Sequence, residues 1–242
     1  MDKVIIVTGG ARGIGKAIVL ALAEVGYKVV LNYNKSEKDA IEIKKILTEK
    51  GQIVETYKAD VSKKSEVEDL VEFTIQKFGK VDVLINNAGI YKFNLIQDIE
   101  EKEWDEIINT NLKSVFLCSQ AVIKDMIKRK SGSIINISSI DGEKGAAGEV
   151  HYVASKAGID GITKALAREL GPSNIRVNSI APGAIDTDMN KDITDEEWKV
   201  VIEETPLRKL GKPEDIAKCV KWLIEDKFTT GQVISVNGGW GM

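Results

Sequence analysis

The sequence predicts an α/β fold: a doubly wound, seven-stranded parallel sheet with helices on both faces. Short runs of β-branched and other apolar residues alternate with longer amphipathic segments along the chain, which is the pattern of repeated β-α-β units. The short runs are apolar on both faces, as strands are when helices cover both sides of a sheet. Right-handed crossovers between parallel strands then distribute the helices over the two faces.

The predicted elements can be given in order along the chain. The predicted strands are 4–7, 29–31, 53–57, 81–85, 133–137, 175–180 and 232–236. The main predicted helices are 15–25, 37–50, 66–78, 101–127 and 152–170.

A polar stretch at 188–209 follows the sixth predicted strand. It contains Thr194 followed by three acidic residues, a pattern typical of the first turn of a helix. Ligands bind at the carboxyl ends of parallel strands, so we expect this stretch to form a lid over the substrate, where Met189 and Trp198 could touch the ligand.

Length and composition bound the kind of protein. The 242 residues contain no Pro/Ser-rich linker or charge block, which predicts one domain over residues 1–242. The formal net charge is −3, with lysines interspersed among acids, so no basic surface for nucleic acid is expected. The apolar run at 4–7 is too short for a signal peptide or a membrane span. Cys118 and Cys219 have no Cys or His nearby in sequence. We expect a cytoplasmic protein that binds neither nucleic acid nor membrane.

A glycine-rich turn follows the first strand. Residues 8–15 read T-G-G-A-R-G-I-G, so Gly9, Gly13 and Gly15 let the chain turn sharply and leave the amino terminus of a helix open. Ile14, inside this turn, is also a predicted cofactor-binding residue. Exposed N–H groups and the helix dipole form an anion site there. The alternative is an ordinary turn between strand and helix. The position after the first strand favours a diphosphate site, and therefore a dinucleotide-binding domain.

Three further residues are spaced as the parts of a hydride-transfer site. Tyr152 lies thirteen residues after Ser139, and Lys156 follows four later, which puts Tyr152 and Lys156 on one helix face. A carbonyl that accepts hydride needs a proton donor and a second hydrogen bond, roles that Tyr152 and Ser139 fit. We expect the Lys156 ammonium and an oxidised nicotinamide to lower the Tyr152 pKa by ~2–3 units. The alternative for Tyr152 and Lys156 alone is a pair of solvent-exposed side chains on a helix. The alternative for Ser139 alone is a hydroxyl at the end of a strand that caps a loop.

The end of the second predicted strand bears on the choice of cofactor. An Asp or Glu there would bind the adenosine ribose and repel a 2′-phosphate. This chain has Asn32 instead, with Lys35 close behind and Arg12 inside the glycine-rich turn, and the arginine fork suits a phosphate. We expect NADP(H), favoured over NAD. The alternative is that both cations are simply solvated.

Together, these motifs resemble the short-chain dehydrogenase/reductase family over nearly the whole chain. The resemblance implies a Rossmann fold, a homotetramer, and the catalytic residues Asn111, Ser139, Tyr152 and Lys156. It implies that Lys156 also binds the nicotinamide ribose and that Asn111 helps hold a water that relays protons. It implies further cofactor contacts from three segments that follow strands: Asp60 and Val61; Asn87, Ala88 and Gly89; and Pro182, Gly183, Ile185 and Thr187.

Within the family, the sequence most resembles the 3-oxoacyl-(acyl-carrier-protein) reductases. This implies reduction of a 3-oxoacyl thioester to the alcohol in fatty acid biosynthesis, with Tyr152 as general acid. An acyl carrier protein can then be a partner, and the basic run at 128–130 could be its docking patch. The same motifs serve sugar (glucose-type) and small secondary alcohol dehydrogenases. These remain alternatives, as does a non-catalytic nucleotide-sensing protein.

Two other chemistries do not fit the sequence. His151, the single histidine, lies beside Tyr152, but Ser139 lacks the G-x-S-x-G context of a hydrolase nucleophile. A triad with Asp141 is therefore not expected, and we expect His151 to shape the pocket entrance or to be exposed to solvent. The carboxylates at 186–192 do not have the spacing of a metal loop, so no catalytic metal is expected.

Overall fold

The computed structural model describes residues 2–190 and 193–241. Within these ranges, seven parallel strands form one sheet in the order β3-β2-β1-β4-β5-β6-β7, which confirms the predicted fold class. The strands are β1 (Val4–Val7), β2 (Lys28–Tyr33), β3 (Val54–Lys58), β4 (Val83–Asn86), β5 (Gly132–Ile137), β6 (Ile175–Pro182) and β7 (Val233–Val236).

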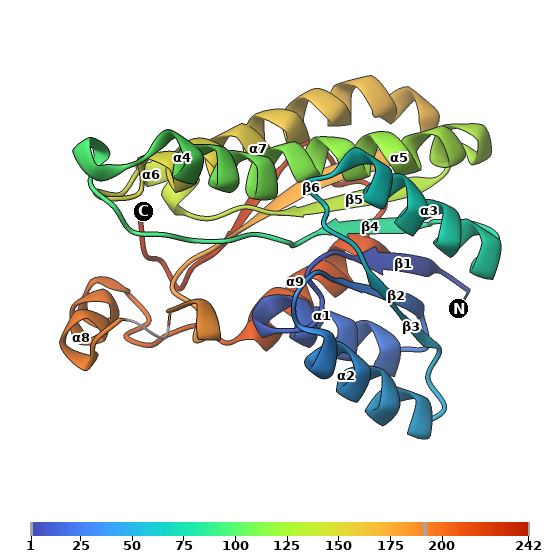
Figure 1. Cartoon of the computed structure of the whole chain (residues 1–242), viewed down its shortest axis with the longest axis horizontal. Helices are drawn as coiled ribbons and strands as arrows, with labels where there is room; N and C mark the ends of the chain where they lie inside the picture. The colour runs from blue at the N-terminus through green and yellow to red at the C-terminus, as the bar shows by residue number, and fades with distance from the viewer. Residues whose placement is uncertain (1, 191–192, 242) are drawn as a thin grey trace.

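Helices cover both faces of the sheet (Figure 1). The layer above the sheet in that view contains α3 (Lys64–Phe78), α4 (Glu101–Ile107), α5 (Ser114–Arg129) and α7 (Val150–Leu170). The layer below it contains α1 (Gly13–Glu24), α2 (Glu37–Glu49) and α9 (Pro213–Glu225). Two further helices, α6 (Asp141–Lys144) and α8 (Asp195–Glu204), lie at the end where α4 begins.

Alternate residues of the strands feed two separate hydrophobic cores. Ile5 and Val7 of β1 pack on one face with Leu22 of α1, while Ile6 packs on the other face with Met126 of α5. Because both faces of the central strand β1 are buried, all four of its residues are apolar. This explains why β1 appears in the sequence as a continuous apolar run.

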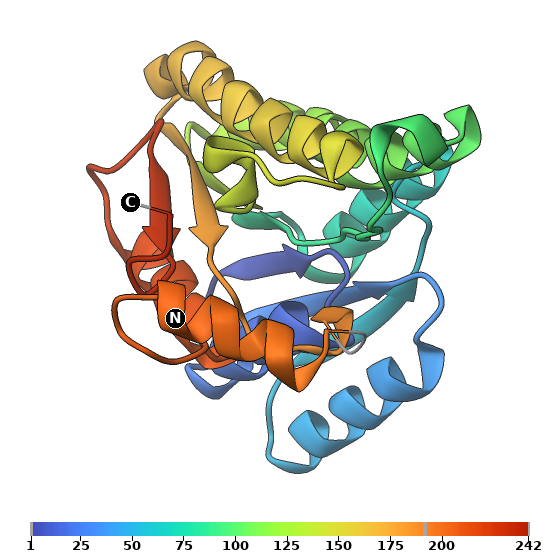
Figure 2. The ribbon, with the colours of Figure 1, turned by 90° about the vertical axis from the view of Figure 1, so that its left-hand side faces the viewer.

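The carboxyl ends of the strands meet at one edge, which Figure 2 views end on with α8 crossing in front. The chain reverses its winding between the neighbours β1 and β4, and such a switch point leaves a crevice. The predicted helix start at Thr194 is confirmed. Its hydroxyl accepts a hydrogen bond from the Glu197 N–H, and its own N–H donates to the Glu197 carboxylate at 2.8 Å, which makes a capping box.

The predicted helix over 101–127 is wrong in its middle. A π-helical turn, η2 (Ile108–Lys113), separates α4 from α5. Asn111 lies in this turn and is tied to the backbone of Ile90, whose N–H donates to its side-chain oxygen and whose carbonyl accepts from its side-chain nitrogen. Apolar periodicity does not reveal such an interruption, because the residues on either side keep helical spacing.

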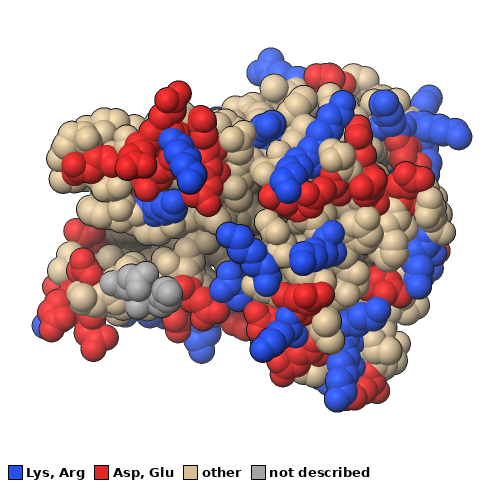
Figure 3. All heavy atoms as spheres, viewed as in Figure 1, with Lys and Arg blue, Asp and Glu red and all other residues tan. Residues whose placement is uncertain are grey.

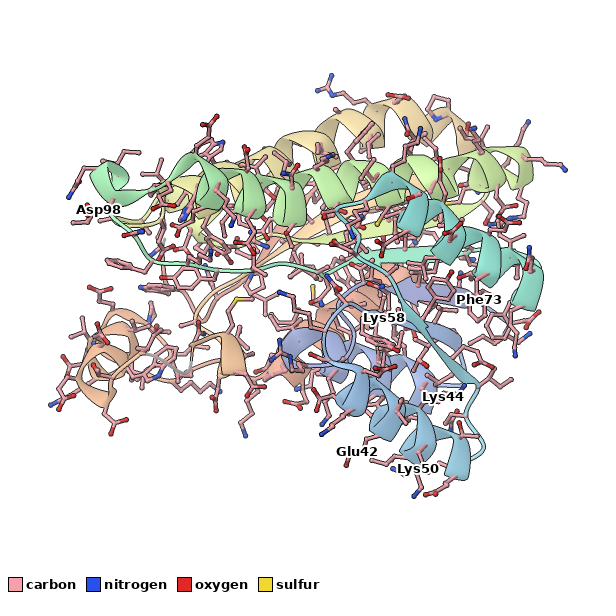
Figure 4. The ribbon with its side chains drawn as sticks, viewed as in Figure 1. Glu42, Lys44, Lys50, Lys58, Phe73 and Asp98 are labelled. Atoms are coloured by element: carbon pink, nitrogen blue, oxygen red, sulfur yellow. The ribbon has the colours of Figure 1, made fainter. Side chains whose placement is uncertain are left out.

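Acidic and basic side chains are interspersed over the face in Figure 3. One ion pair ties α2 to β3: Lys44, labelled in Figure 4, lies 2.6 Å from the Glu55 carboxylate. The basic run at 128–130 lies at the carboxyl end of α5, at the end of the molecule opposite α8 (Figure 1). Arg129 there pairs with Asp82 and Asp125 at 3.1 and 2.8 Å, so less of the charge is free for a partner than the sequence suggests. No helix in the described part of the chain is both long and apolar enough to cross a membrane.

Candidate active site

One cavity of about 930 Å³ runs along the carboxyl ends of the strands, and Figure 3 shows a hollow at the same end of the molecule. Asn111 is the one predicted site residue that does not line it, because it is buried behind the wall. All the others line it together: Gly9, Arg12, Gly13, Ile14, Gly15, Asn32, Lys35, Asp60, Val61, Asn87, Ala88, Gly89, Ser139, Tyr152, Lys156, Pro182, Gly183, Ile185 and Thr187.

The turn between β1 and α1 fits an anion, although its glycines serve different purposes. A Cβ on Gly15 would lie 2.3 Å from the Gly9 carbonyl oxygen, which is a clash. Gly15 therefore allows the start of α1 to pack closely against the backbone of the turn. Gly13, with φ +50, instead faces Thr187 across the cavity. Among the described residues, no side chain caps α1, and its first turn contains no acid. Its amino-terminal N–H groups are therefore available to a diphosphate.

Thr8 and Asn87 join the glycine-rich turn to the end of β4. The Thr8 hydroxyl accepts hydrogen bonds from the N–H groups of Asn87 and Ala88, both at 3.0 Å. The Asn87 amide donates to the carbonyls of Thr8 and Gly9 at 2.9 and 3.0 Å. These bonds fix the turn against its neighbouring strand, so Asn87 shapes the cavity as well as lining it.

The end of β2 carries no acid and is bordered by cations. Asn32 is 1% exposed, and its amide donates to the Ala59 carbonyl while its oxygen accepts from the Gly9 N–H. Its side chain therefore supports the glycine-rich turn. Arg12 and Lys35 are both exposed and line the cavity.

Asp60 lies beyond these cations, after β3. Burial raises the pKa of its carboxyl, but the hydrogen bonds that it accepts from the N–H and hydroxyl of Ser62 outweigh burial and lower the pKa overall. The neighbouring Val61 is buried. This edge of the cavity therefore presents a charged carboxylate beside an apolar side chain.

Tyr152 and Lys156 lie one turn apart on α7, on the same face, as predicted. Lys156 is 5% exposed. Its Nζ donates to the Ile137 carbonyl at 2.9 Å and lies 5.4 Å from the centre of the Tyr152 ring. Burial lowers the pKa of Lys156 to about 8, because a low-dielectric environment disfavours the charged form.

The Tyr152 pKa moves in the opposite direction to the one expected. Burial raises it, the charge of Asp141 raises it further, and Glu149 adds to this, while the nearby Ser139 hydroxyl acts in the opposite sense. The prediction of a lowered pKa is thus wrong for the protein chain by itself. The main physical cause is burial of the phenol, which disfavours its charged form, and the charges of Asp141 and Glu149 add to this effect.

Ser139 follows β5 and is buried close to Tyr152. Its hydroxyl donates to the Asp141 carboxylate at 2.9 Å and accepts from the Asp141 N–H at 3.2 Å. The hydroxyl proton of Ser139 therefore points to the Asp141 carboxylate. No triad forms, because the His151 ring bonds Glu103 and the Tyr152 backbone instead.

Asn111 faces the same small space as Lys156. Its amide nitrogen donates to the Ile90 carbonyl and to the Ser155 hydroxyl at 2.9 and 3.2 Å. A Cβ placed on Gly89 would lie 3.4 Å from the Asn111 side-chain oxygen and 3.8 Å from the Lys156 Nζ. The glycine thus leaves room between these two polar groups.

The segment after β6 forms the opposite wall. The Gly183 N–H donates to the Val236 carbonyl at 3.1 Å, and a Cβ on Gly183 would lie 2.7 Å from Asn237. Ile185 is buried and forms a bridge to Gly211. Close packing of this segment against β7 therefore sets the position of Thr187 opposite Gly13.

Tyr91, Glu149 and Trp240 are among the cavity-lining residues that were missed from the sequence. Tyr91 and Glu149 lie near Tyr152, and Trp240 comes from the chain's last turn. The Trp240 indole donates to Glu204 of α8 at 3.2 Å, and the Lys144 Nζ lies 3.5 Å from the centre of its ring. Glu149 had a visible signal, three residues before Tyr152, but only the fold brings the others to the site. Met189 and Trp198 line the cavity, as expected.

His151 is fully buried, so the expectation that it shapes the entrance or is exposed is wrong. The reason is that α4 packs over the start of α7: the His151 Nε2 lies 3.1 Å from the Glu103 carboxylate. The Nδ1 accepts the Tyr152 N–H at 3.0 Å, which leaves the proton on Nε2. In the part of the chain described here, no three His, Cys, Asp or Glu side chains come together as metal ligands.

A family model described as short chain dehydrogenase matches residues 3–198. The chain belongs to the short-chain dehydrogenase family. Membership makes it an oxidoreductase, and the family implies a nicotinamide cofactor. The uncapped start of α1 fits the diphosphate of such a group.

Short-chain dehydrogenases with similar sequences match the chain over its whole length. A protein of Staphylococcus epidermidis (strain ATCC 35984) is 45% identical over 100% of both chains. One of Staphylococcus aureus (strain Mu50) is 43% identical over 100% of this chain and 99% of the relative. One of Thermotoga maritima is 41% identical over 98% of this chain and 97% of the relative. Each is named 3-oxoacyl-(acyl-carrier-protein) reductase.

Proposed function

We propose that this enzyme reduces the 3-oxo group of an acyl thioester to the alcohol, with NADPH as the reductant. The observation that carries the proposal is the convergence of Ser139, Tyr152 and Lys156 in one cavity beside a turn that fits a diphosphate. The full-length similarity to proteins named 3-oxoacyl-(acyl-carrier-protein) reductase supports the substrate class.

The catalytic roles follow from the contacts of each group. When bound, the nicotinamide supplies a hydride to the carbonyl carbon. Tyr152, whose phenol is protonated at neutral pH, donates its proton to the carbonyl oxygen. Ser139 gives the oxygen a second hydrogen bond once its hydroxyl turns from Asp141. Lys156 returns a proton to Tyr152, since its pKa of about 8 lets it gain and lose one near neutrality.

Asn111 completes the proton path in this proposal. Its side-chain oxygen accepts the Ile90 N–H and retains a second lone pair. A water beside Gly89 would be within reach of this oxygen and of the Lys156 ammonium. Asn111 thus acts from behind the cavity wall, which fits its complete burial.

The cofactor contacts are proposed on the same basis. The glycine-rich turn and Ile14 would hold the diphosphate, and Asp60 with Val61 would border the adenine. The segment 87–89 would line the middle of the cofactor. Lys156, Tyr152 and the wall formed by Pro182, Gly183, Ile185 and Thr187 would contact the nicotinamide end.

NADP is preferred in this proposal because the adenosine end of the cavity carries Arg12 and Lys35 and the end of β2 itself carries no acid. A 2′-phosphate there would gain charge-assisted hydrogen bonds. The Arg12→Ala and Lys35→Ala variants should each raise the KM for NADPH and leave that for NADH nearly unchanged, with Lys16→Ala as a control on the exposed side of α1. A wild-type enzyme that prefers NADH contradicts the assignment.

We also propose a single dinucleotide-binding domain whose segment 188–209 serves as substrate lid, although residues 191–192 lie outside the described ranges. α8 supports this, because Trp198 and Val201 line the cavity and Glu204 holds Trp240. A cytoplasmic homotetramer that can accept substrate from an acyl carrier protein completes the proposal. Light scattering that gives a monomer mass would overturn the tetramer.

The experiment that tests the function follows NADPH absorbance with an acetoacetyl thioester and with simple ketones, and NADP reduction with glucose and secondary alcohols. Fast thioester reduction supports the proposal. Turnover of sugars or alcohols alone moves the enzyme to another branch of its family. No turnover with any of these substrates, with NADPH bound, would point to a nucleotide sensor.

A further inference from the structure

Residues 237–241, which follow β7, are tied to the wall of the cavity. The Asn237 amide nitrogen donates to the Trp240 carbonyl at 2.7 Å, and its side-chain oxygen accepts the Gly239 N–H at 2.9 Å. The same asparagine packs against the segment after β6, where a Cβ on Gly183 would lie 2.7 Å from the Asn237 Cα. These contacts fix the backbone that carries Trp240.

The Trp240 indole bridges helices from opposite sides of the cavity. Its Nε1–H donates to the Glu204 carboxylate of α8 at 3.2 Å, and the Lys144 Nζ of α6 lies 3.5 Å from the centre of its ring. Figure 1 shows the segment after β7 between these two helices. Trp240 also lines the cavity. The indole therefore forms the wall where the cavity passes between α6 and α8.

Contacts place this wall on the catalytic side of the cavity. Lys144, which lies over the indole, is 3.6 Å from the Asp141 carboxylate. That carboxylate accepts the Ser139 hydroxyl at 2.9 Å. Only two side chains thus separate Trp240 from Ser139, and their opposite charges offset each other. The indole lies where the part of a substrate next to its reacting carbonyl would bind.

The wall around the indole suits a hydrocarbon chain. The single hydrogen-bond donor of the Trp240 side chain is already used by Glu204, so its remaining surface is apolar. The proposed lid adds four large apolar side chains to the lining of the same cavity: Met189, Ile193, Trp198 and Val201. Burial of methylene groups against such a surface is favourable.

We propose that Trp240 is a specificity-determining residue that contacts the acyl chain of the substrate and limits its length. The acyl chain extends from the 3-oxo carbon along the apolar lining of the lid and ends at the indole. Each methylene buried on the way should raise kcat/KM about fourfold, and methylenes beyond the indole find no space. This inference rests on the proposed reduction of an acyl thioester.

The test compares Trp240→Ala with wild type on acetoacetyl, 3-oxooctanoyl and 3-oxododecanoyl thioesters of N-acetylcysteamine. Trp222→Ala is the matched control, because Trp222 is 47% exposed on α9 and lies outside the cavity wall. NADPH oxidation gives kcat/KM for each thioester. Calorimetry with NADP present gives the Kd of each 3-hydroxyacyl product, a readout that needs no turnover. If Trp240→Ala does not fold, Trp240→Leu replaces it.

We expect the preference of Trp240→Ala to move to longer acyl chains. The ratio of kcat/KM for the 3-oxododecanoyl to the 3-oxooctanoyl thioester should rise about tenfold or more, because the space of an indole admits at least two further methylenes at about fourfold each. The ratio of the product Kd values should change by a similar factor, and Trp222→Ala should keep the wild-type profile.

Two results overturn the role of Trp240. One is a chain-length profile that stays unchanged in the folded variant. The other is a loss of rate by the same factor at every length, as a loosened lid would cause. A wild-type enzyme that reduces no thioester instead overturns the proposed function. Trp240 is then tested with methyl ketones of the same chain lengths, where the absence of a shift again overturns its role.

Discussion

Replacing Lys156 with methionine should make the protein more stable while removing its activity. The lysine is 5% exposed, and burial lowers its pKa from 10.5 to about 8. Each pKa unit corresponds to about 1.4 kcal/mol, so keeping the ammonium charged in the folded protein at pH 7 costs about 3 kcal/mol. Methionine has similar length and no charge, but leaves the Ile137 carbonyl without its donor, a loss of about 1 kcal/mol. The net gain in the free energy of unfolding should be about 2 kcal/mol.

The difference in the free energy of unfolding between wild type and Lys156→Met should depend on pH. Between pH 8 and 10.5 the folded lysine is neutral while the unfolded one is still charged. The unfolded state then binds more protons, so the wild-type free energy of unfolding rises through this window relative to the Lys156→Met variant. The advantage of the variant is therefore full below pH 8 and fades as the pH approaches 10.5.

Urea unfolding of both proteins at pH 7 and near pH 10.5 measures this difference. Lys164→Met is the matched control, because Lys164 lies on the same helix but is exposed; its effect should stay within about 0.5 kcal/mol at both values of pH. A Lys156→Met variant that is no more stable than wild type at pH 7, or whose advantage is the same near pH 10.5, would refute the reasoning.

Three further predictions concern the site. Tyr152→Phe should abolish turnover yet bind NADPH with a Kd within about threefold of wild type, since the phenol donates the proton and contributes little to binding. Fluorescence titration and rate assays check this, and near-normal turnover would contradict the role of Tyr152 as proton donor. Gly15→Ala should destabilise the protein by about 1–3 kcal/mol and weaken cofactor binding, because the new Cβ meets the Gly9 carbonyl at 2.3 Å; thermal unfolding with wild-type stability would contradict it. Asn87→Ala should cost about 2–3 kcal/mol by leaving the Thr8 and Gly9 carbonyls without their donor; an unchanged urea midpoint would show that the bonds are dispensable.

The sequence predicts the sheet and the cofactor side of the site well, because these depend on local patterns. Strands buried on both faces are continuous apolar runs, and the glycine-rich turn is contiguous from Thr8 to Gly15. The spacing of Tyr152 and Lys156 translates directly into one helix face. Side chains that follow parallel strands must meet at one edge, so segments distant in sequence reach the same cavity.

What the sequence does not predict depends on tertiary packing. The π-helical turn at Asn111 follows from a bond to Ile90, twenty-one residues away. Burial of His151 follows from α4 lying over α7, and Trp240 reaches the cavity through its bond to Glu204. The Tyr152 pKa depends on which charges the fold brings near the phenol, and spacing along one helix reveals only Lys156.

The central claim is that Tyr152 protonates the 3-oxo group of an acyl thioester while NADPH is oxidised. Its most direct test is kcat/KM for an acetoacetyl thioester with NADPH, measured for wild type and for Tyr152→Phe. The account predicts saturable, stoichiometric NADPH oxidation with the 3-hydroxyacyl thioester as product, lost in the variant. Thioester turnover that survives in Tyr152→Phe, or a wild-type enzyme that oxidises sugars or alcohols but leaves the thioester untouched, would contradict it.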